Sequence, residues 1–253
     1  MLAELPVAFP RPRWIIAWIA ACCIGLIVLA PASLMGWCLR FATDGRIGLA
    51  EPAGSFWNGS GYVTALHEGG DAPIRWRIYP HVLLLGQLRV GVFQGASPEG
   101  TVTLSPAELR LAGLNLLFPA SVLGQALQPL SGARLGGEVR LQSDTLLLSG
   151  NQAAGALRAT LSNASSGLVA SRALGSYEFS AVGADRKMAF ELKSVKGPLI
   201  VAGTGSWAWG QNATFTGSMS AEPGKQSELS AVLSIGGAPN SAGAVDLSWP
   251  ARR

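Results

Sequence analysis

The sequence predicts a mainly β protein, in which one N-terminal transmembrane helix precedes a single, mostly antiparallel β domain. Three features support this fold class: a long uncharged segment at residues 14–39, alternation of apolar and polar residues along the rest of the chain, and glycine-rich clusters between the alternating runs. The 253 residues include 32 glycines without a three-residue repeat, and only 13% are charged. This composition excludes collagen and favours short strands separated by turns.

The uncharged segment has tryptophans at positions 14 and 37, near its two ends. About 20 apolar residues are enough for a helix to cross the hydrocarbon core, and indole rings favour the membrane interface. We therefore expect a cytoplasmic tail at residues 1–13, a transmembrane anchor at residues 14–39 and an exported β domain at residues 40–253. A large domain crosses the membrane largely regardless of its charge, so the N-terminus is expected in the cytoplasm.

Three other interpretations of this segment remain open on the sequence alone. A signal peptidase could cut after Ala32, because Ala30 and Ala32 are small residues at the required spacing. Cys22 ends a lipoprotein-like run, although more apolar residues follow it instead of a polar tether. The segment could also be a buried core helix, which would be apolar on every side. The three cysteines are Cys22, Cys23 and Cys38, so residues 39–253 form no disulfide among themselves.

The strands are predicted from period-2 alternation. Ile74, Trp76 and Ile78 share one face of an extended segment, while Arg75 and Arg77 share the other. The same pattern recurs at residues 88–92, 102–104, 139–141, 157–161, 177–181, 188–192 and 199–201, around Val232, and at residues 245–249. Turn-rich clusters at residues 68–71, 95–98, 162–167, 183–185 and 236–240 separate these runs, which is typical of antiparallel sheets.

Helix is expected at only one place beyond the anchor. Pro119 opens a short helical segment at residues 119–127, since proline is favoured in the first turn of a helix. Residues 109–118 are apolar enough to be either strand or helix, and the pattern does not decide between them. Because no linker divides the exported part, it is predicted to be one extended β unit.

Motifs for chemistry are missing from the sequence. His67 and His81 are far apart and lack a second histidine at ligand spacing, and no nucleophile elbow or phosphate-binding loop occurs. Gly203 and Gly205 form a Gly-x-Gly that we interpret as a turn between strands. The net charge of +4 comes without a basic stripe, which argues against nucleic-acid binding. We therefore predict no catalytic residues, no metal and no cofactor, although scattered carboxylates keep a membrane-tethered enzyme as a third hypothesis.

Three short motifs follow the apolar segment in order. Residues 54–59, Gly-Ser-Phe-Trp-Asn-Gly, fit a Gly-x-x-Trp-x-Gly pattern; residues 174–177 read Leu-Gly-Ser-Tyr; residues 197–207 begin Gly-Pro-Leu and contain the Gly-x-Gly and a tryptophan. In this order the chain resembles the family of type II secretion system protein N, of the general secretion pathway. The match is loosest at the last strand. The candidate structural or partner-binding residues are Gly54, Trp57, Gly59, Gly197, Pro198, Gly203, Gly205 and Trp207.

The resemblance implies an inner-membrane protein of a Gram-negative bacterium with its β domain in the periplasm. It implies a non-enzymatic accessory role in type II secretion, with the inner-membrane platform proteins L and M, protein C and the secretin D as partners. The family is also similar to the AsmA-like group of long, curved periplasmic sheets. That similarity implies an alternative function, in which an apolar β-groove handles or senses lipid.

Trp57 is expected to act in one of two ways. With Phe56 it could plug the open end of the sheet, while the neighbouring glycines allow close backbone approach. It could instead be an anchor for a partner close to the membrane. Neither role is catalytic.

Overall fold

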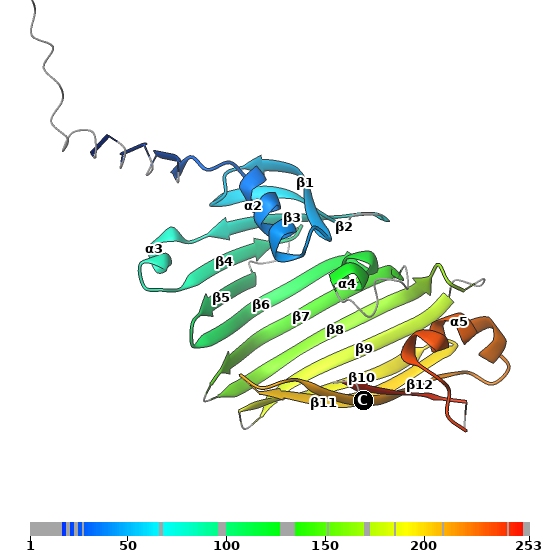
Figure 1. Cartoon of the computed structure of the whole chain (residues 1–253). Helices are drawn as coiled ribbons and strands as arrows, with labels where there is room; N and C mark the ends of the chain where they lie inside the picture. The colour runs from blue at the N-terminus through cyan, green and yellow to red at the C-terminus, as the bar shows by residue number, and fades with distance from the viewer. Residues whose placement is uncertain are drawn as a thin grey trace, which may run out of the picture.

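The computed structural model describes residues 17–249, apart from 19–20, 23–24, 27, 66–67, 96–99, 127–134, 151, 170–172, 185, 209 and 242. Within these residues, thirteen strands form one sheet, and each strand pairs antiparallel with the next along the chain (Figure 1). The strands are β1 (Ile47–Gly54), β2 (Asn58–Ala65), β3 (Glu68–Ile78), β4 (Leu88–Phe93), β5 (Gly100–Ser105), β6 (Glu108–Pro119), β7 (Leu135–Ser149), β8 (Ala153–Ser166), β9 (Ala173–Ala184), β10 (Lys187–Lys196), β11 (Leu199–Ala208), β12 (Thr214–Ala221) and β13 (Val245–Trp249). The predicted mainly β, antiparallel fold is confirmed.

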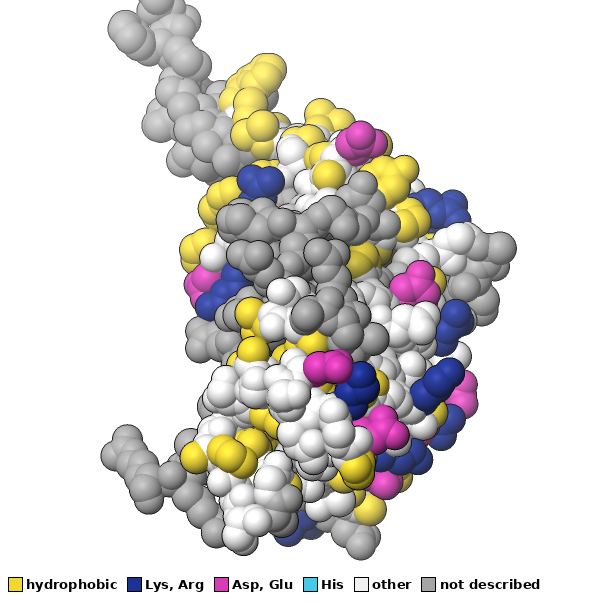
Figure 2. Space-filling view, turned by 90° about the vertical axis from the view of Figure 1, so that its right-hand side faces the viewer, with side chains coloured by type: hydrophobic (Ala, Val, Ile, Leu, Met, Phe, Trp, Pro, Cys, Tyr) yellow, Lys and Arg dark blue, Asp and Glu magenta, His cyan; other side chains and the backbone are white. Residues whose placement is uncertain are grey.

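The sheet has one apolar and one polar face, because side chains alternate along each strand. On β9 and β10, for example, Phe179 pairs with Leu192 on the apolar face. One position away, Glu178 pairs with Lys193 on the polar face. The same division continues from strand to strand across the curved sheet. Figure 2 shows Lys and Arg side chains gathered along one long side of the molecule.

Three helices cover parts of the apolar face. They are α2 (Ser33–Ala42), α4 (Ala120–Ala126) and α5 (Gln226–Gly236), while α3 (Pro80–Leu83) is a single turn between β3 and β4. Val122 of α4 packs with Ile47 of β1 in one core cluster. Leu229 of α5 is buried with Val245 of β13 in the largest cluster. Figure 1 shows α2 and α4 over the first half of the sheet and α5 near its last strands.

One part of the apolar face is packed by strand side chains alone. A separate cluster there contains buried Leu148 and Met188 with partly buried Phe179 and Phe190. Leu88 on β4 and Leu104 on β5 pair with each other and are 38% and 46% exposed. The sheet therefore presents apolar side chains to solvent at β4 and β5.

Several elements differ from the sequence-based expectations. The predicted strand around Val232 is wrong: this residue lies in α5, where Leu229, Val232 and Leu233 are buried at helical spacing. The Gly-x-Gly turn is also wrong, because Gly203 and Gly205 lie inside β11. Residues 109–118, for which strand and helix were both possible, belong to β6. The short helix near residues 119–127 is confirmed as α4.

The predicted anchor at residues 14–39 falls partly outside the described residues. In the described part, Pro31 forms an antiparallel bridge with Ser55, and α2 begins at Ser33 and continues to Ala42. Among the described stretches, no helix is both long enough and apolar enough to span a bilayer. The structure thus places residues 33–42 against the sheet as a separate helix.

Candidate functional site

The first motif forms a tight connection between β1 and β2. Gly54 ends β1 with a positive φ of 89°, and Gly59 is the second residue of β2. Between them, the Ser55 N–H donates to the Asn58 carbonyl at 2.9 Å, and the Asn58 N–H donates to Ser55 Oγ at 3.1 Å. Phe56 and Trp57 sit at the tip of this connection, with ring centroids 5.3 Å apart in an edge-to-face contact.

Trp76 of β3 is the buried aromatic of this region. It is 4% exposed, and its indole Nε1–H donates to the Phe56 carbonyl at 2.9 Å. The ring lies over Gly59, where an added Cβ would come within 2.5 Å of Trp76 Cζ2. Any side chain at position 59 would therefore displace the indole. The alternation in residues 74–78 placed Trp76 on an apolar face, but nothing in the sequence linked it to the glycine motif.

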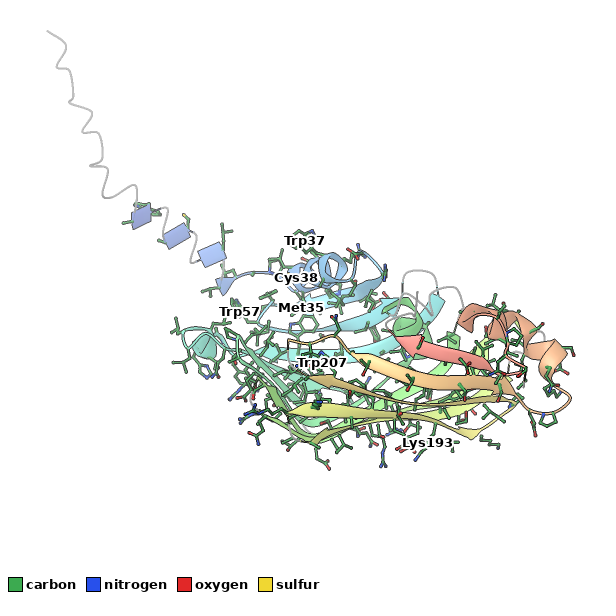
Figure 3. All side chains as sticks on the ribbon, turned by 60° about the horizontal axis from the view of Figure 1, so that its bottom comes forward. Met35, Trp37, Cys38, Trp57, Lys193 and Trp207 are labelled. Atoms are coloured by element: carbon green, nitrogen blue, oxygen red, sulfur yellow. The ribbon has the colours of Figure 1, made fainter. Side chains whose placement is uncertain are left out.

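Trp57 lies at the edge of the same core cluster. It is half-buried, and its backbone carbonyl accepts the Ile78 N–H at 2.7 Å. Trp57 and Met35 of α2 (both labelled in Figure 3) pack against the same cluster, in which Trp76 is buried. Trp57 keeps enough exposed surface for the two expected roles to stay predictions.

The first motif also holds the chain segment that precedes α2. The Phe56 N–H donates to the Ala30 carbonyl at 2.8 Å, and the Ala32 N–H donates to the Gly54 carbonyl at 3.2 Å. We call this region, residues 30–32 with 54–59 and Trp76, the N-terminal junction. Because these two backbone hydrogen bonds form an antiparallel bridge between Pro31 and Ser55, the chain enters the sheet at a fixed point.

The second and third motifs meet in space, although residues 178–196 lie between them in the sequence. Gly175 of β9 faces Gly197, which precedes β11, and both have positive φ, of 137° and 126°. A Cβ added to Gly197 would overlap the Gly175 backbone and lie 2.6 Å from the Leu174 carbonyl oxygen. We call this contact, residues 174–177 with 197–199, the C-terminal junction.

Tyr177 ties the two sides of the C-terminal junction together. Its phenolic oxygen lies 2.9 Å from the Leu174 carbonyl oxygen and 3.0 Å from that of Leu199, so the single O–H donates to either one. Burial raises the pKa of Tyr177 well above its ordinary value, because the phenolate is poorly solvated there. The side chain is therefore a neutral donor at physiological pH. On the same side, the Glu222 N–H donates to the Pro198 carbonyl at 2.8 Å.

The remaining candidates, Gly203, Gly205 and Trp207, follow one another along the apolar face of β11. The Phe215 ring of β12 occupies the space where Gly203 would carry a Cβ. Trp207 is half-buried, pairs with Met188 of β10, and donates its indole N–H to the Gln211 carbonyl at 2.9 Å. The eight candidate residues thus occupy three places in the fold and do not converge on one cavity.

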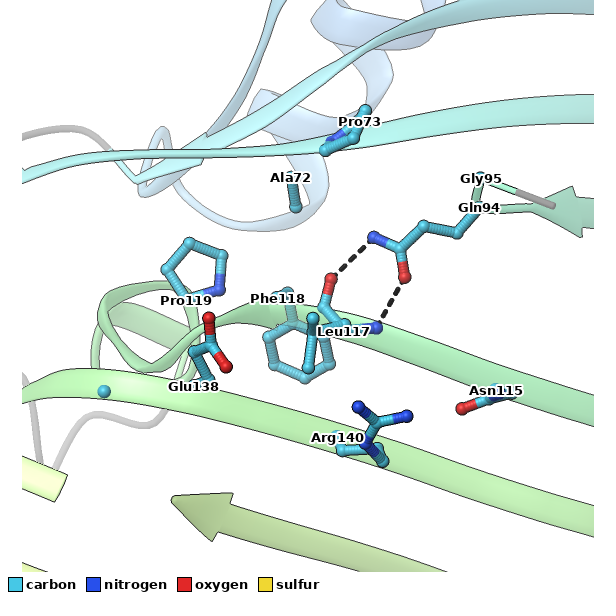
Figure 4. A pocket seen from close by; sticks show the side chains of 11 residues that line it. Ala72, Pro73, Gln94, Gly95, Asn115, Leu117, Phe118, Pro119, Glu138 and Arg140 are labelled. Atoms are coloured by element: carbon cyan, nitrogen blue, oxygen red, sulfur yellow. Dashed lines mark hydrogen bonds between the residues drawn. The ribbon is translucent and has the colours of Figure 1, made fainter. Parts of the chain in front are cut away.

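A hollow of about 610 Å³ with a mixed polar and apolar lining lies elsewhere, between β3 and β6. It forms where the shorter β4 and β5 leave β6 without a neighbouring strand. Gln94 substitutes for the missing strand: its amide N–H donates to the Leu117 carbonyl at 2.6 Å, and its carbonyl accepts the Leu117 N–H at 2.5 Å (Figure 4). Glu138 and Arg140 line the hollow. Among the described residues that line it there is one carboxylate, that of Glu138, and no nucleophile, so we assign it no chemistry.

The charged groups of the polar face form ordinary surface pairs. Arg158 and Lys193 both approach the Glu178 carboxylate, at 3.3 Å and 3.8 Å. Within the residues that the structure describes, no group of three or more His, Cys, Asp or Glu side chains is placed to hold a metal ion. What the structure shows for the candidate residues is close packing and backbone hydrogen bonds.

A family model described as type II secretion system protein N matches residues 45–248 of this chain. The chain belongs to the type II secretion system protein N family. The match confirms the resemblance drawn from the three motifs, and membership implies a component of type II secretion. No curated protein and no solved structure gives a significant match.

The region matched by the protein N family model includes the C-terminal junction and most of the N-terminal one. In both junctions of this chain, glycine lets two backbone segments come close together, and a buried aromatic side chain donates a hydrogen bond to a backbone carbonyl. Sequence reasoning found the glycines but missed the pairing of the second motif with the third. That pairing depends on the register of β9, β10 and β11, and no local sequence pattern reports it.

Proposed function

We propose that this protein is a non-enzymatic, single-pass inner-membrane accessory component of the type II secretion pathway. In this proposal it contributes to the assembly or stability of the machine that exports folded proteins across the outer membrane. The family match over residues 45–248 is the observation that carries the proposal. The segment before the N-terminal junction would be the anchor, with the N-terminus in the cytoplasm and the sheet in the periplasm.

The geometry of the two junctions supports a structural role over a chemical one. The Trp76 and Tyr177 donors are both bound to backbone carbonyls inside the fold. The N-terminal junction connects the predicted anchor to the sheet through backbone hydrogen bonds, without a flexible linker. A rigid sheet held close to the membrane suits a scaffold that positions neighbouring proteins.

The partners that we propose are the inner-membrane platform proteins L and M, protein C and the secretin D. Family membership suggests these proteins as a group. The described sheet offers two kinds of surface for them: the charged polar face, and the outer edge of β13, which pairs only with β12 among the described strands. An unpaired strand edge can accept a strand from another chain.

The proposal is tested by deleting the gene in its host and measuring secreted type II substrates in the culture medium. We expect secretion or the level of assembled secretin to fall, and the wild-type gene to restore it. A photo-crosslinking residue at Asp246 of β13 should capture platform proteins or the secretin, whereas one at Glu222, away from this edge, serves as the comparison. Normal secretion, normal assembly and no captured secretion protein would together contradict the proposal.

A second candidate function is the handling or sensing of lipid by the apolar face. The observation that favours it is the exposure of Leu88 and Leu104 on β4 and β5 of this face. A fluorescent acyl probe should bind the purified protein, and Leu104→Glu should weaken binding several-fold. Val182→Glu is the matched control, because Val182 is 49% exposed on the opposite face. Equal effects of the two substitutions would rule out the groove.

A further inference from the structure

Helix α2 has two apolar faces, and the sheet covers only one of them. On the inner face, Gly36 is buried, and an added Cβ would lie 3.3 Å from the Leu49 side chain. On the outer face, Leu34, Trp37 and Phe41 are 43%, 64% and 77% exposed. Their spacing of i, i+3 and i+7 places them in one stripe along the helix. We call these three residues the outer stripe.

The outer stripe is uncharged and aromatic. Trp37 and Phe41 stack with ring centroids 5.7 Å apart. Arg40 is the one charged residue of α2, and it turns away from the stripe toward Gly48 of β1. A helix on the surface of a water-soluble domain normally carries polar residues on its outer face. Packing within the fold therefore accounts for the inner face of α2 but not for the outer stripe.

The position of α2 along the chain limits how far the stripe lies from the predicted anchor. Four residues, at about 3.4 Å each, allow at most ~14 Å between Leu29 and Ser33. The N-terminal junction pins the intervening residues to the β1–β2 connection. If the uncharged residues 14–29 cross the bilayer as a helix, their length of ~24 Å falls short of the ~30 Å hydrocarbon core, so α2 has to begin next to the membrane surface. Tryptophan at that depth is favourable, and short apolar helix faces bind there.

We propose that α2 lies along the periplasmic surface of the bilayer, with the outer stripe in the headgroup and upper acyl region of the phospholipids. This inference rests on the proposed function, because it requires the preceding segment to be the anchor. The occupant of the stripe is lipid and not a protein, since the stripe continues an uncharged segment that already favours lipid. The anchor and the outer stripe together set the orientation of the sheet relative to the membrane plane.

The test uses the full chain in vesicles of phosphatidylethanolamine and phosphatidylglycerol. Cys22→Ala and Cys23→Ala leave Cys38, an exposed residue beside the outer stripe, as the single thiol for an environment-sensitive fluorophore. Two matched chains carry the same fluorophore elsewhere. One keeps only Cys22, within the predicted span, and the other is cysteine-free except for Ser218→Cys on the exposed polar face of β12. Quenchers are nitroxide lipids with a shallow or a deep label, and aqueous iodide.

We expect the fluorophore at Cys38 to be quenched about two-fold or more by the shallow nitroxide and weakly by iodide, as for an interfacial helix. The Cys22 fluorophore should respond to the deep nitroxide, and the Ser218→Cys fluorophore to iodide alone. If Cys38 behaves like Ser218→Cys while Cys22 responds to lipid, the inference is wrong and the anchor stands. If Cys22 also shows no lipid quenching, the anchor itself is contradicted. Shielding of Cys38 from both quenchers would identify a protein occupant and overturn the inference.

A second comparison separates the stripe from a general effect of apolar residues. Trp37→Ser with Phe41→Ser should abolish the shallow quenching at Cys38 and increase quenching by iodide. Leu84→Ser is the control, because Leu84 is 89% exposed but lies in the turn after α3. It should leave the Cys38 signal unchanged. Retained shallow quenching in the Trp37→Ser/Phe41→Ser chain would contradict the assignment of the stripe.

Discussion

The N-terminal and C-terminal junctions are built alike but face different surroundings. In each, glycine allows two backbone segments to touch, and a buried aromatic donates to a carbonyl of the neighbouring segment. The C-terminal junction encloses its aromatic, since Tyr177 is 8% exposed. The N-terminal junction buries Trp76 but leaves its own Trp57 partly exposed, and α2, which follows the junction, exposes Trp37 and Phe41.

This difference distinguishes a region that contributes only to folding from a region that also has surface available for binding. A region that uses all of its apolar surface internally contributes stability and little else. A region that leaves large aromatics exposed beside a predicted anchor has surface available for lipid or for a partner. We therefore expect changes at the C-terminal junction to act through folding alone, and changes around the N-terminal junction to act through folding and membrane position.

The largest expected effect follows from Gly197→Ala at the C-terminal junction. The new Cβ would overlap the Gly175 backbone, so we expect a loss of about 4 kcal/mol or more in the free energy of unfolding. Gly224→Ala is the matched control, because Gly224 also has a positive φ, of 85°, but no heavy atom within 4 Å of an added Cβ. The control should lose only about 1–2 kcal/mol, the cost of the left-handed backbone. Urea unfolding of the full chain in detergent micelles measures both; equal losses would refute the close contact.

The next effect concerns the aromatics of the N-terminal junction. Trp76→Ala should cost about 3–5 kcal/mol, because it removes a fully buried ring. Trp57→Ala should cost less, about 2 kcal/mol, since its ring is only half-buried; Trp207→Ala on β11 should behave similarly. If Trp57 anchors a partner, the melting temperature of the Trp57→Ala chain will stay near that of wild type, and the recovery of crosslinked secretion proteins will fall instead. An unchanged melting temperature and unchanged recovery would refute both roles.

A smaller effect is expected for Tyr177→Phe, which leaves the ring in place and removes one hydrogen bond. The free energy of unfolding should fall by about 1 kcal/mol. Because folding raises the pKa of Tyr177 above the ordinary value of about 10, its contribution is constant below pH 10 and is lost as the pH rises further. The wild-type chain should therefore lose stability more steeply above pH 10 than Tyr177→Phe. Parallel alkaline profiles for the two chains would show that the phenol is not buried as described.

The smallest effect on stability is expected at the outer stripe. Trp37→Ser with Phe41→Ser removes exposed side chains, so the free energy of unfolding in micelles should change by no more than about 0.5 kcal/mol. The melting temperature should therefore stay nearly constant. A loss as large as that of Trp57→Ala would mean that the stripe is part of the core. Thermal unfolding followed by circular dichroism distinguishes these outcomes.

The sequence predicted much of the sheet because alternation is a local property. Residues 74–78, 88–92 and 188–192 have large apolar side chains at every second position, and all of them lie in strands. β1 and β2 were not predicted, because glycine and proline interrupt their apolar pattern in Ile47–Gly54 and Asn58–Ala65. α5 was missed because Val232 was taken alone, without Leu229 and Leu233.

The candidate residues were found one by one, but their arrangement was not. Gly203 and Gly205 look like a turn in the sequence because glycine is favoured in turns. In the structure both lie in the middle of a strand, where Gly203 makes room for the Phe215 ring and Gly205 for the Thr214 carbonyl group. The contact between Gly175 and Gly197 depends on a register shift between Ser194 and Lys196 in β10. The spacing of residues in a single sequence does not predict tertiary contacts of this kind.

The most direct test of the account measures secretion per molecule of folded protein in cells. A deletion strain would carry either the Trp37→Ser/Phe41→Ser chain or the Tyr177→Phe chain, and secreted substrate would be divided by the amount of protease-resistant sheet. We predict that Tyr177→Phe lowers protein level and secretion in proportion, so the ratio equals that of wild type. The Trp37→Ser/Phe41→Ser chain should be present at the wild-type level, but the ratio of secreted substrate to folded protein should be lower than in wild type. A wild-type ratio for both chains would contradict the claim that the N-terminal end has a role beyond folding.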